Sequence, residues 1–147
     1  MIVGLGMDLT EIGRIERLLA RHPERSRAKL FTAGEREYCD RKGAPGRHFA
    51  ARFAAKEATF KALSGSEEAR WIGWQEIEVA NSPLDGRPLL RLHGRAGQRA
   101  AELGVTRVHV TLTHSEGLAA AVVVLEAVDD RGRRESEADS SALGHAL

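Results

Sequence analysis

Residues 49–63, FAARFAAKEATFKAL, are the stretch that decides the fold. At about 100° per residue of a helix, this stretch places its large apolar side chains on one stripe: Phe49, Phe53, Phe60 and Leu63. A second stripe carries only small side chains: Ala50, Ala54 and Ala58. A helix that is apolar on two sides is enclosed by the rest of its domain. The pattern therefore predicts a long central helix over about residues 47–64, ended by Gly65.

A strand and two helices are expected before this central helix. Residues 2–8 place large apolar side chains at every second position, which predicts a strand. A helix follows, with Thr10 as its N-cap, and stops near Pro23. A second helix begins at Thr32-Ala33-Gly34-Glu35, which has the spacing of a capping box, and runs to about Lys42. The first helix buries one apolar face: Ile12, Ile15 and Leu19.

Alternation with a period of two dominates the chain after the central helix. It predicts short strands around residues 76–79 and 89–92, and two longer strands over 108–113 and 118–128 that pair as a hairpin. A short helix is expected over residues 96–103. Helices grouped early and antiparallel strands late indicate an α+β domain, with helices packed on a small antiparallel sheet, rather than a doubly wound sheet.

The composition excludes several classes of protein. The 147 residues are 42% hydrophobic and 29% charged with a net charge of +1, which indicates neither a nucleic-acid binder nor a membrane-surface protein. Cys39 is the only cysteine, no apolar run reaches the roughly 18–20 residues of a membrane span, and the N-terminus lacks a secretory signal. A reducing cytoplasm is therefore expected. Residues 1–128 are assigned to one domain, and residues 129–147, with eight charged residues, to a disordered tail.

Two carboxylates from different elements, Asp8 and Glu57, are the first candidates for chemistry. Asp8 ends Gly4-Leu5-Gly6-Met7-Asp8, where the glycines allow either the close approach of a ligand or only the closer packing of a helix. Glu57 stands four residues before Lys61, and the two form either a surface ion pair or an enclosed charged pair. Two carboxylates suit Mg²⁺, which completes its shell with water and phosphate oxygens.

Positive charge on the central helix extends this hypothesis. Arg52 and Lys61 would neutralise a polyphosphate, and a metal ion with a lysine is typical of phosphoryl-type transfer. Lys56 projects near the phenylalanine stripe, where its ammonium is expected to snorkel to solvent. Zinc is not expected, because the lone cysteine and the scattered histidines lack ligand spacing.

Two further patterns leave alternatives open. The strand Val110-Thr111-Leu112-Thr113-His114 ends in a histidine that is either structural or half of a dyad with Ser115, although no Gly-x-Ser-x-Gly elbow is present. Four arginines would share one stripe if the first helix reached far enough: Arg14, Arg17, Arg21 and Arg25. That stripe is either a solvated face or a docking surface for an acidic partner. Residues 1–61 carry a net charge of +5, against −2 for residues 62–128.

These motifs resemble, in their order, those of holo-acyl-carrier-protein synthases, the short class of 4′-phosphopantetheinyl transferases. The resemblance covers about residues 1–127 and rests on three segments: Gly4-Leu5-Gly6-Met7-Asp8-Leu9 before an arginine-bearing helix, Arg52-Phe53-Ala54-Ala55-Lys56-Glu57-Ala58 with Lys61-Ala62-Leu63, and Val110-Thr111-Leu112-Thr113-His114. The family moves the 4′-phosphopantetheine arm of coenzyme A onto a serine of apo acyl carrier protein. Adenosine 3′,5′-bisphosphate is released, and the modified carrier serves fatty-acid biosynthesis.

The resemblance implies a role for each candidate residue. Asp8 and Glu57 would bind the Mg²⁺ ion that also contacts the coenzyme A pyrophosphate. Lys61 would steady that pyrophosphate, while Arg52 and His114 would contribute to the coenzyme A site. Glu57, His114 or a metal-bound water would take the proton of the carrier serine. The acidic helix of the carrier protein would meet three arginines: Arg14, Arg17 and Arg21.

The resemblance also implies an assembly and leaves rivals open. A homotrimer with active sites between subunits would place His114 of one subunit beside Asp8 of the next. Some members of the family have an acid directly after this histidine, where this chain has Ser115, so activation by a His–Asp pair loses support. One rival is a non-catalytic binding module that holds an acidic partner through the Arg14/Arg17/Arg21 face. Another is a hydrolase built on Ser115 and His114.

Overall fold

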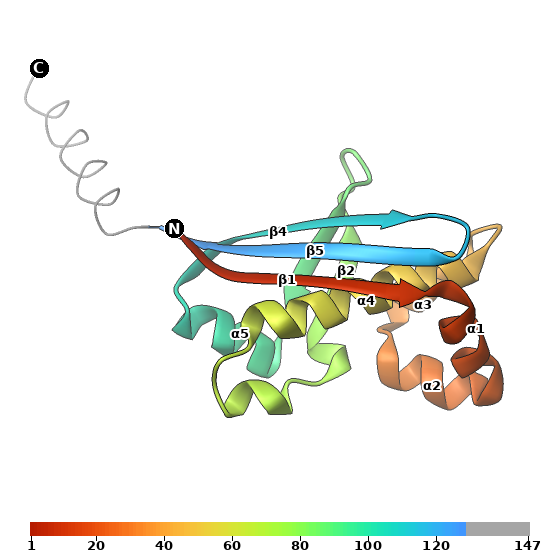
Figure 1. Ribbon diagram of the computed structural model, residues 1–147, viewed down its shortest axis with the longest axis horizontal. Coiled ribbons are helices and arrows are strands. Elements are labelled where there is room, and N and C mark those ends of the chain that lie inside the picture. The colour runs from red at the N-terminus through yellow and green to blue at the C-terminus, as the bar shows by residue number, and fades with distance from the viewer. Residues whose placement is uncertain (129–147) are drawn as a thin grey trace, which may run out of the picture.

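A three-stranded antiparallel sheet with one long helix against it forms the centre of the molecule (Figure 1). This computed structural model describes residues 1–128. The sheet has the order β1–β5–β4, and its strands are β1 (Ile2–Glu11), β4 (Val105–His114) and β5 (Leu118–Ala127). The long helix, α4 (Pro45–Leu63), packs against β1 and β5. The expected central helix, the final hairpin and the α+β class are confirmed.

Smaller elements gather around the two ends of α4 (Figure 1). One end carries α1 (Ile12–Arg21), α2 (Pro23–Leu30) and α3 (Ala33–Asp40). The other end carries a 3₁₀ turn, Glu68–Trp71, and α5 (Gly94–Glu102). A second 3₁₀ turn, Trp74–Glu76, leads into a separate hairpin of β2 (Ile77–Asn81) and β3 (Pro88–Leu92).

The glycine face of β1 lies directly against α4. A Cβ atom on Gly6 would lie 1.8 Å from the carbonyl oxygen of Ala58, and one on Gly4 would lie 2.4 Å from that of Ala62. Any side chain at these positions would force the strand away from the helix. The glycines and the alanine stripe of α4 therefore set a close approach, and Asp8, which follows on the same face of β1, is brought beside α4.

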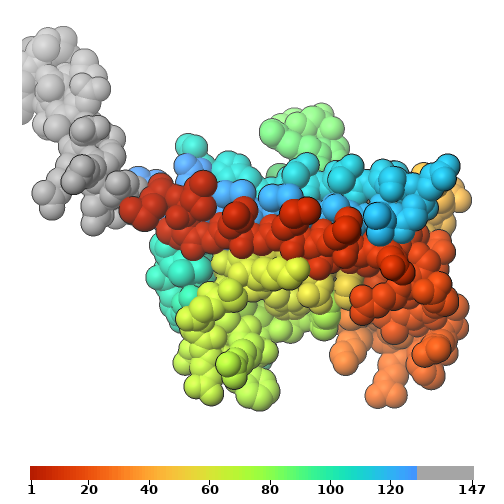
Figure 2. Space-filling view, in the orientation of Figure 1, coloured from red at the N-terminus to blue at the C-terminus, as the bar shows by residue number. Residues whose placement is uncertain are grey.

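The outer face of β1 carries large apolar side chains that stay exposed. Leu5 is 66% exposed, Met7 59% and Leu9 60%, and nothing within residues 1–128 covers them. Their partners in β5 on the same outer face are Val124, Val122 and Ala120. Figure 2 shows β1, in red, crossing one side of the molecule. An exposed apolar stripe of this kind is typical of a protein–protein interface.

The start of α1 differs from the expectation that Thr10 is its N-cap. Thr10 and Glu11 still pair with Ala119 and Leu118, so β1 is longer than expected and α1 begins only at Ile12. The helix starts without a side-chain cap. The Thr10 hydroxyl donates a hydrogen bond to Asp8 instead.

Helix α2 is missed by the sequence interpretation, which treats Pro23 only as a stop signal. Proline also suits the first turn of a helix, where no backbone donor is needed, and Pro23 begins α2 in this way. Because α1 ends at Arg21, Arg25 belongs to a different helix. The expected row of four arginines is therefore reduced to three on α1.

The expectation that Lys56 snorkels to solvent is wrong. Its side chain is fully buried, and its ammonium lies 2.8 Å from the carboxylate of the equally buried Glu35. Glu35 is held in place by the capping box at the start of α3, which the sequence does predict. The spacing of the motif gives no sign of this long-range pair.

The tail expected over residues 129–147 lies outside the described residues, and the division into a domain and a tail stays a prediction. None of the helices within residues 1–128 has both the length and the hydrophobicity required to cross a membrane.

Candidate active site

Asp8, Glu57 and Lys61 come together where β1 passes α4. The Lys61 ammonium donates to the Met7 carbonyl at 2.7 Å and to Asp8 Oδ1 at 3.1 Å. The other Asp8 oxygen accepts the Thr10 hydroxyl at 2.6 Å. The Asp8 side chain is 15% exposed, whereas that of Lys61 is 52% exposed. The carboxylate is thus fixed in orientation, while the cation beside it reaches into solvent.

Glu57 is held close enough to Asp8 for the two charges to repel. Partial burial raises the pKa of Glu57, the Asp8 charge raises it further, and Lys61 and Arg14 lower it. Two carboxylates in this relation provide a place for a cation, and the Lys61 ammonium already occupies part of it. Within residues 1–128 no group of three or more His, Cys, Asp or Glu side chains could hold a metal ion. A pair of carboxylates still fits Mg²⁺, which keeps waters and takes phosphate oxygens as further ligands.

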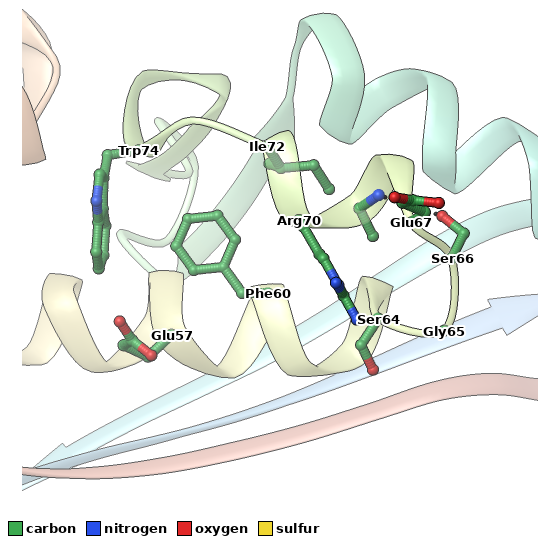
Figure 3. Close-up of a pocket in the computed structure, with 10 residues that line it drawn as sticks. Glu57, Phe60, Ser64, Gly65, Ser66, Glu67, Arg70, Ile72 and Trp74 are labelled. Atoms are coloured by element: carbon green, nitrogen blue, oxygen red, sulfur yellow. Dashed lines mark hydrogen bonds between the residues drawn. The ribbon is translucent and has the colours of Figure 1, made fainter.

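A cavity of about 760 Å³ opens beside Glu57 (Figure 3). Glu57, Phe60 and Ser64 lie along α4 on one side, and Arg70, Ile72 and Trp74 face them from the following segment. The far end is closed by Gly65, Ser66 and Glu67. Volumes of this size are typical of small-molecule sites. Of these residues, sequence reasoning selects only Glu57 for a site.

The cavity wall could not be recognised from the sequence pattern. Phe60 belongs to the apolar stripe of α4 by its spacing, yet it is only partly buried and lines the cavity. Arg70 and Trp74 lie on short segments without periodicity. The one available signal is the small-residue run Ser64-Gly65-Ser66 at the end of α4, where Gly65 has a φ of 101°.

A second cluster of cations surrounds His48 near the other end of α4. Arg52 is 3% exposed, its guanidinium carbon lies 4.0 Å from the centre of the Tyr38 ring, and its Nη2 donates to Asn81 at 2.8 Å. The Arg52 Nε is buried without a partner. The His48 and His114 rings are 6.1 Å apart. Burial lowers the pKa of His48, and the nearby charge of Arg52 lowers it further.

The structure does not bring this second cluster to Asp8 within one chain. At about 100° per residue, Arg52 is about 140° around the helix from Glu57 and about 180° from Lys61. Within one chain, Arg52 and Lys61 therefore face opposite sides of α4. Residue roles at both clusters stay predictions.

Helix α1 presents its arginines to solvent, and the proposed Ser115–His114 dyad lies at the turn between β4 and β5. Arg14, Arg17 and Arg21 are all exposed, and the Arg14 charge is near enough to lower the pKa of Glu57. The Ser115 backbone closes a turn by donating to Leu118. Among residues 1–128 no hydrogen bond joins the Ser115 hydroxyl to the His114 ring, so the geometry gives the hydrolase no support.

Comparison with known proteins agrees with this arrangement. The sequence profile of the 4′-phosphopantetheinyl transferase superfamily matches residues 4–123. The chain belongs to the 4′-phosphopantetheinyl transferase superfamily. A holo-[acyl-carrier-protein] synthase of Anaeromyxobacter sp. (strain K) is 47% identical over 129 residues, covering 86% of this chain and 97% of the relative. That of Syntrophus aciditrophicus (strain SB) is 44% identical over 130 residues, covering 88% and 100%.

Solved structures of the same superfamily share the fold. The holo-[acyl-carrier-protein] synthase of Neisseria meningitidis superposes with a TM-score of 0.74 at 28% identity, covering 86% of this chain and 99% of that one. The enzyme of Bacillus anthracis, in complex with CoA (3′,5′-ADP), superposes with a TM-score of 0.69 at 32% identity, covering 87% and 99%. These members of the phosphopantetheinyl transferase superfamily confirm the resemblance inferred from the motifs.

Proposed function

We propose that this chain transfers the 4′-phosphopantetheine arm of coenzyme A to a serine of an apo acyl carrier protein, as a step of fatty-acid biosynthesis in the cytoplasm. The observation that carries the proposal is the meeting of Asp8, Glu57 and Lys61 at the edge of a 760 Å³ cavity. Relatives 44–47% identical over almost their whole length are named holo-[acyl-carrier-protein] synthases.

Mg²⁺ fits the carboxylate pair. Asp8 and Glu57 would hold the ion, and its charge would offset the partial burial and the repulsion from Asp8 that together raise the pKa of Glu57. When bound, the ion would supply positive charge that neutralises the coenzyme A pyrophosphate. Lys61 would then leave Asp8 and donate to a pyrophosphate oxygen, since its side chain is half exposed.

The reaction is an in-line displacement at the β-phosphorus of coenzyme A. The serine oxygen forms a bond to that phosphorus, and the bond to the bridging pyrophosphate oxygen breaks, so adenosine 3′,5′-bisphosphate leaves with the electron pair. Lys61 stabilises the charge on the leaving phosphate. Glu57, His114 or a metal-bound water would take the serine proton, and of these Glu57 lines the cavity.

The second cluster supplies the nucleotide end of the site from a neighbouring subunit. Arg52 is a buried cation with a free Nε and no carboxylate within ion-pair distance among residues 1–128, which suits a phosphate group. His114 lies in the same cluster through His48. In a homotrimer joined through the exposed apolar face of β1, Arg52 and His114 of one subunit would meet Asp8 and Glu57 of the next.

The carrier protein is held by the exposed arginines of α1, the first of which, Arg14, lies near enough to Glu57 for its charge to act there. Charge complementarity to an acidic helix would raise the rate of association and fix the register of the serine over the β-phosphate. The residues in this docking role are Arg14, Arg17 and Arg21.

Intact-mass spectrometry of an apo carrier protein tests the proposal. Incubation with this chain, coenzyme A and Mg²⁺ is expected to add the mass of one phosphopantetheine arm to the carrier. The Asp8→Asn chain is expected to leave the carrier unmodified, and Ser115→Ala to retain transfer. Binding of the carrier without any mass change would instead support the non-catalytic binding module.

A further inference from the structure

The buried ion pair between Lys56 and Glu35 is a charged feature that the proposed reaction does not use. Both side chains are fully buried. The Lys56 ammonium has three acceptors: Glu35 Oε2 at 2.8 Å, the Leu30 carbonyl at 2.7 Å and the Trp74 carbonyl at 2.9 Å. Its three protons are therefore all used, and none remains for a substrate.

Both carboxylate oxygens of Glu35 also have hydrogen-bond partners. Its Oε2 also accepts the Thr32 backbone N–H at 2.8 Å, and its Oε1 accepts the Val79 backbone N–H at 2.7 Å. The pair thus joins four segments to α4: the end of α2, the start of α3, the second 3₁₀ turn and β2. Burying two charges is expensive, and it is tolerated only where every donor and acceptor is satisfied.

Trp74 connects this pair to the cavity. Lys56 holds its backbone carbonyl, and its ring stacks on Phe53 with centres 5.1 Å apart and meets Phe60 edge-on at 5.0 Å. In Figure 3 the Trp74 ring forms the end of the cavity nearest Glu57. The same 3₁₀ turn is also fixed through Gln75, whose amide donates to the Ala28 and Phe31 carbonyls, and through Glu76, whose carboxylate accepts from backbone N–H groups. Within residues 1–128, Lys56 is the one side chain that hydrogen-bonds to Trp74 itself.

We propose that Lys56 and Glu35 are positioning residues for the substrate cavity, which hold Trp74 so that its ring forms the wall beside Glu57. An apolar pair of the same size would fill the space but would not direct a hydrogen bond to the Trp74 carbonyl. The consequence for catalysis rests on the proposed function, whereas the consequence for Trp74 does not.

Fluorescence of Trp74 tests the positioning without any assay of transfer. The chain has two tryptophans, so a Trp71→Phe background, which removes an exposed ring outside the cavity, leaves Trp74 as the only emitter. Replacing the pair by Glu35→Gln with Lys56→Met is expected to raise acrylamide quenching of Trp74 about 2-fold. The matched control is Cys39→Ala, which perturbs the buried core of α3 and is expected to leave quenching unchanged.

Unchanged quenching in a folded double variant would overturn the proposal. Should the double variant not fold, Lys56→Met alone, which removes the bond to the Trp74 carbonyl, takes its place under the same criterion.

A double-mutant cycle, with the KM for coenzyme A as the measured quantity, then separates positioning of Trp74 from a general loss of stability. Removing the pair is expected to raise that KM about 5-fold in the unmodified chain and less than 2-fold in a Trp74→Ala background, because the ring it positions is already absent. Equal factors in both backgrounds would contradict positioning through Trp74. Absence of transfer by the unmodified chain would contradict the proposed function instead, and the quenching result would still decide the role of the pair.

Discussion

Asp8 accepts from Lys61 with one carboxylate oxygen and from Thr10 with the other. This arrangement would let Asp8 serve the site both without a metal ion and with Mg²⁺ bound. Lys61 acts as a counter-ion to Asp8 in the structure, at 3.1 Å. A divalent ion bound by Asp8 and Glu57 would displace that ammonium toward the pyrophosphate. Thr10 would keep the carboxylate oriented with the ion bound as well, since its bond goes to the other oxygen.

Glu57→Gln is expected to reduce transfer about 10²–10³-fold without lowering the melting temperature. The folded-state pKa of Glu57 is raised, so protonation stabilises the fold below the unfolded-state pKa, and this contribution is lost as pH rises through the folded-state value. At neutral pH the neutral glutamine avoids the repulsion from Asp8. Kinetics with coenzyme A and scanning calorimetry check the two parts.

Near-normal transfer by Glu57→Gln would show that Glu57 is not part of the active site. A large drop in melting temperature would show instead that its charge supports the fold.

At the scale of elements, the approach of β1 to α4 was predictable in part. The alanine stripe and the strand glycines are visible in the sequence, and so is the small face that each presents. The buried Lys56–Glu35 pair and the cavity wall at Trp74 could not be predicted, because they join residues 14 or more apart in the chain and no local period records such contacts. The prediction of Thr10 as an N-cap is wrong because pairing of β1 with β5 overrides a local capping signal.

Gly6→Ala is expected to destabilise the fold by about 3 kcal/mol, since its Cβ would lie 1.8 Å from the Ala58 carbonyl oxygen. Gly34→Ala is the matched control: it lies within α3 with nothing inside 4 Å of a new Cβ, and is expected to stabilise by about 0.5–1 kcal/mol. Urea unfolding of both variants measures the difference. Equal effects would show that the close approach does not depend on Gly6.

Arg21→Glu, on the exposed face of α1, is expected to raise the KM for the carrier protein about 10-fold and to leave the KM for coenzyme A unchanged. The increase should shrink at high salt, because the contact is exposed. Arg87→Glu, an exposed arginine beside the β2–β3 turn, serves as the control for a change of net charge. If both KM values rise equally, α1 is not the docking surface.

At the scale of the whole molecule, two features would be explained by an assembly of several copies of the chain. The outer face of β1 is apolar and exposed, and the Arg52–His48–His114 cluster lies on the far side of α4 from Lys61. A symmetric assembly joined through β1 would cover the first and bring the second to a neighbour's Asp8. A single arrangement would thus answer both observations.

Met7→Lys should dissociate such an assembly, because it places a charge in the middle of the apolar face. Light scattering after size-exclusion chromatography is expected to give a trimer for the unmodified chain and a monomer for the variant, with loss of transfer. Thr106→Lys, an exposed position toward the far end of β4, is the control. A monomeric unmodified chain that transfers at full rate would rule out a shared site.

Calorimetry of coenzyme A binding, with and without Mg²⁺, tests most directly whether Asp8 and Glu57 hold a cation that grips the pyrophosphate. Mg²⁺ is expected to tighten binding at least about 10-fold for the unmodified chain and to have no effect on Asp8→Asn. Equal affinity for coenzyme A in the presence and absence of Mg²⁺, in the unmodified chain, would contradict the account.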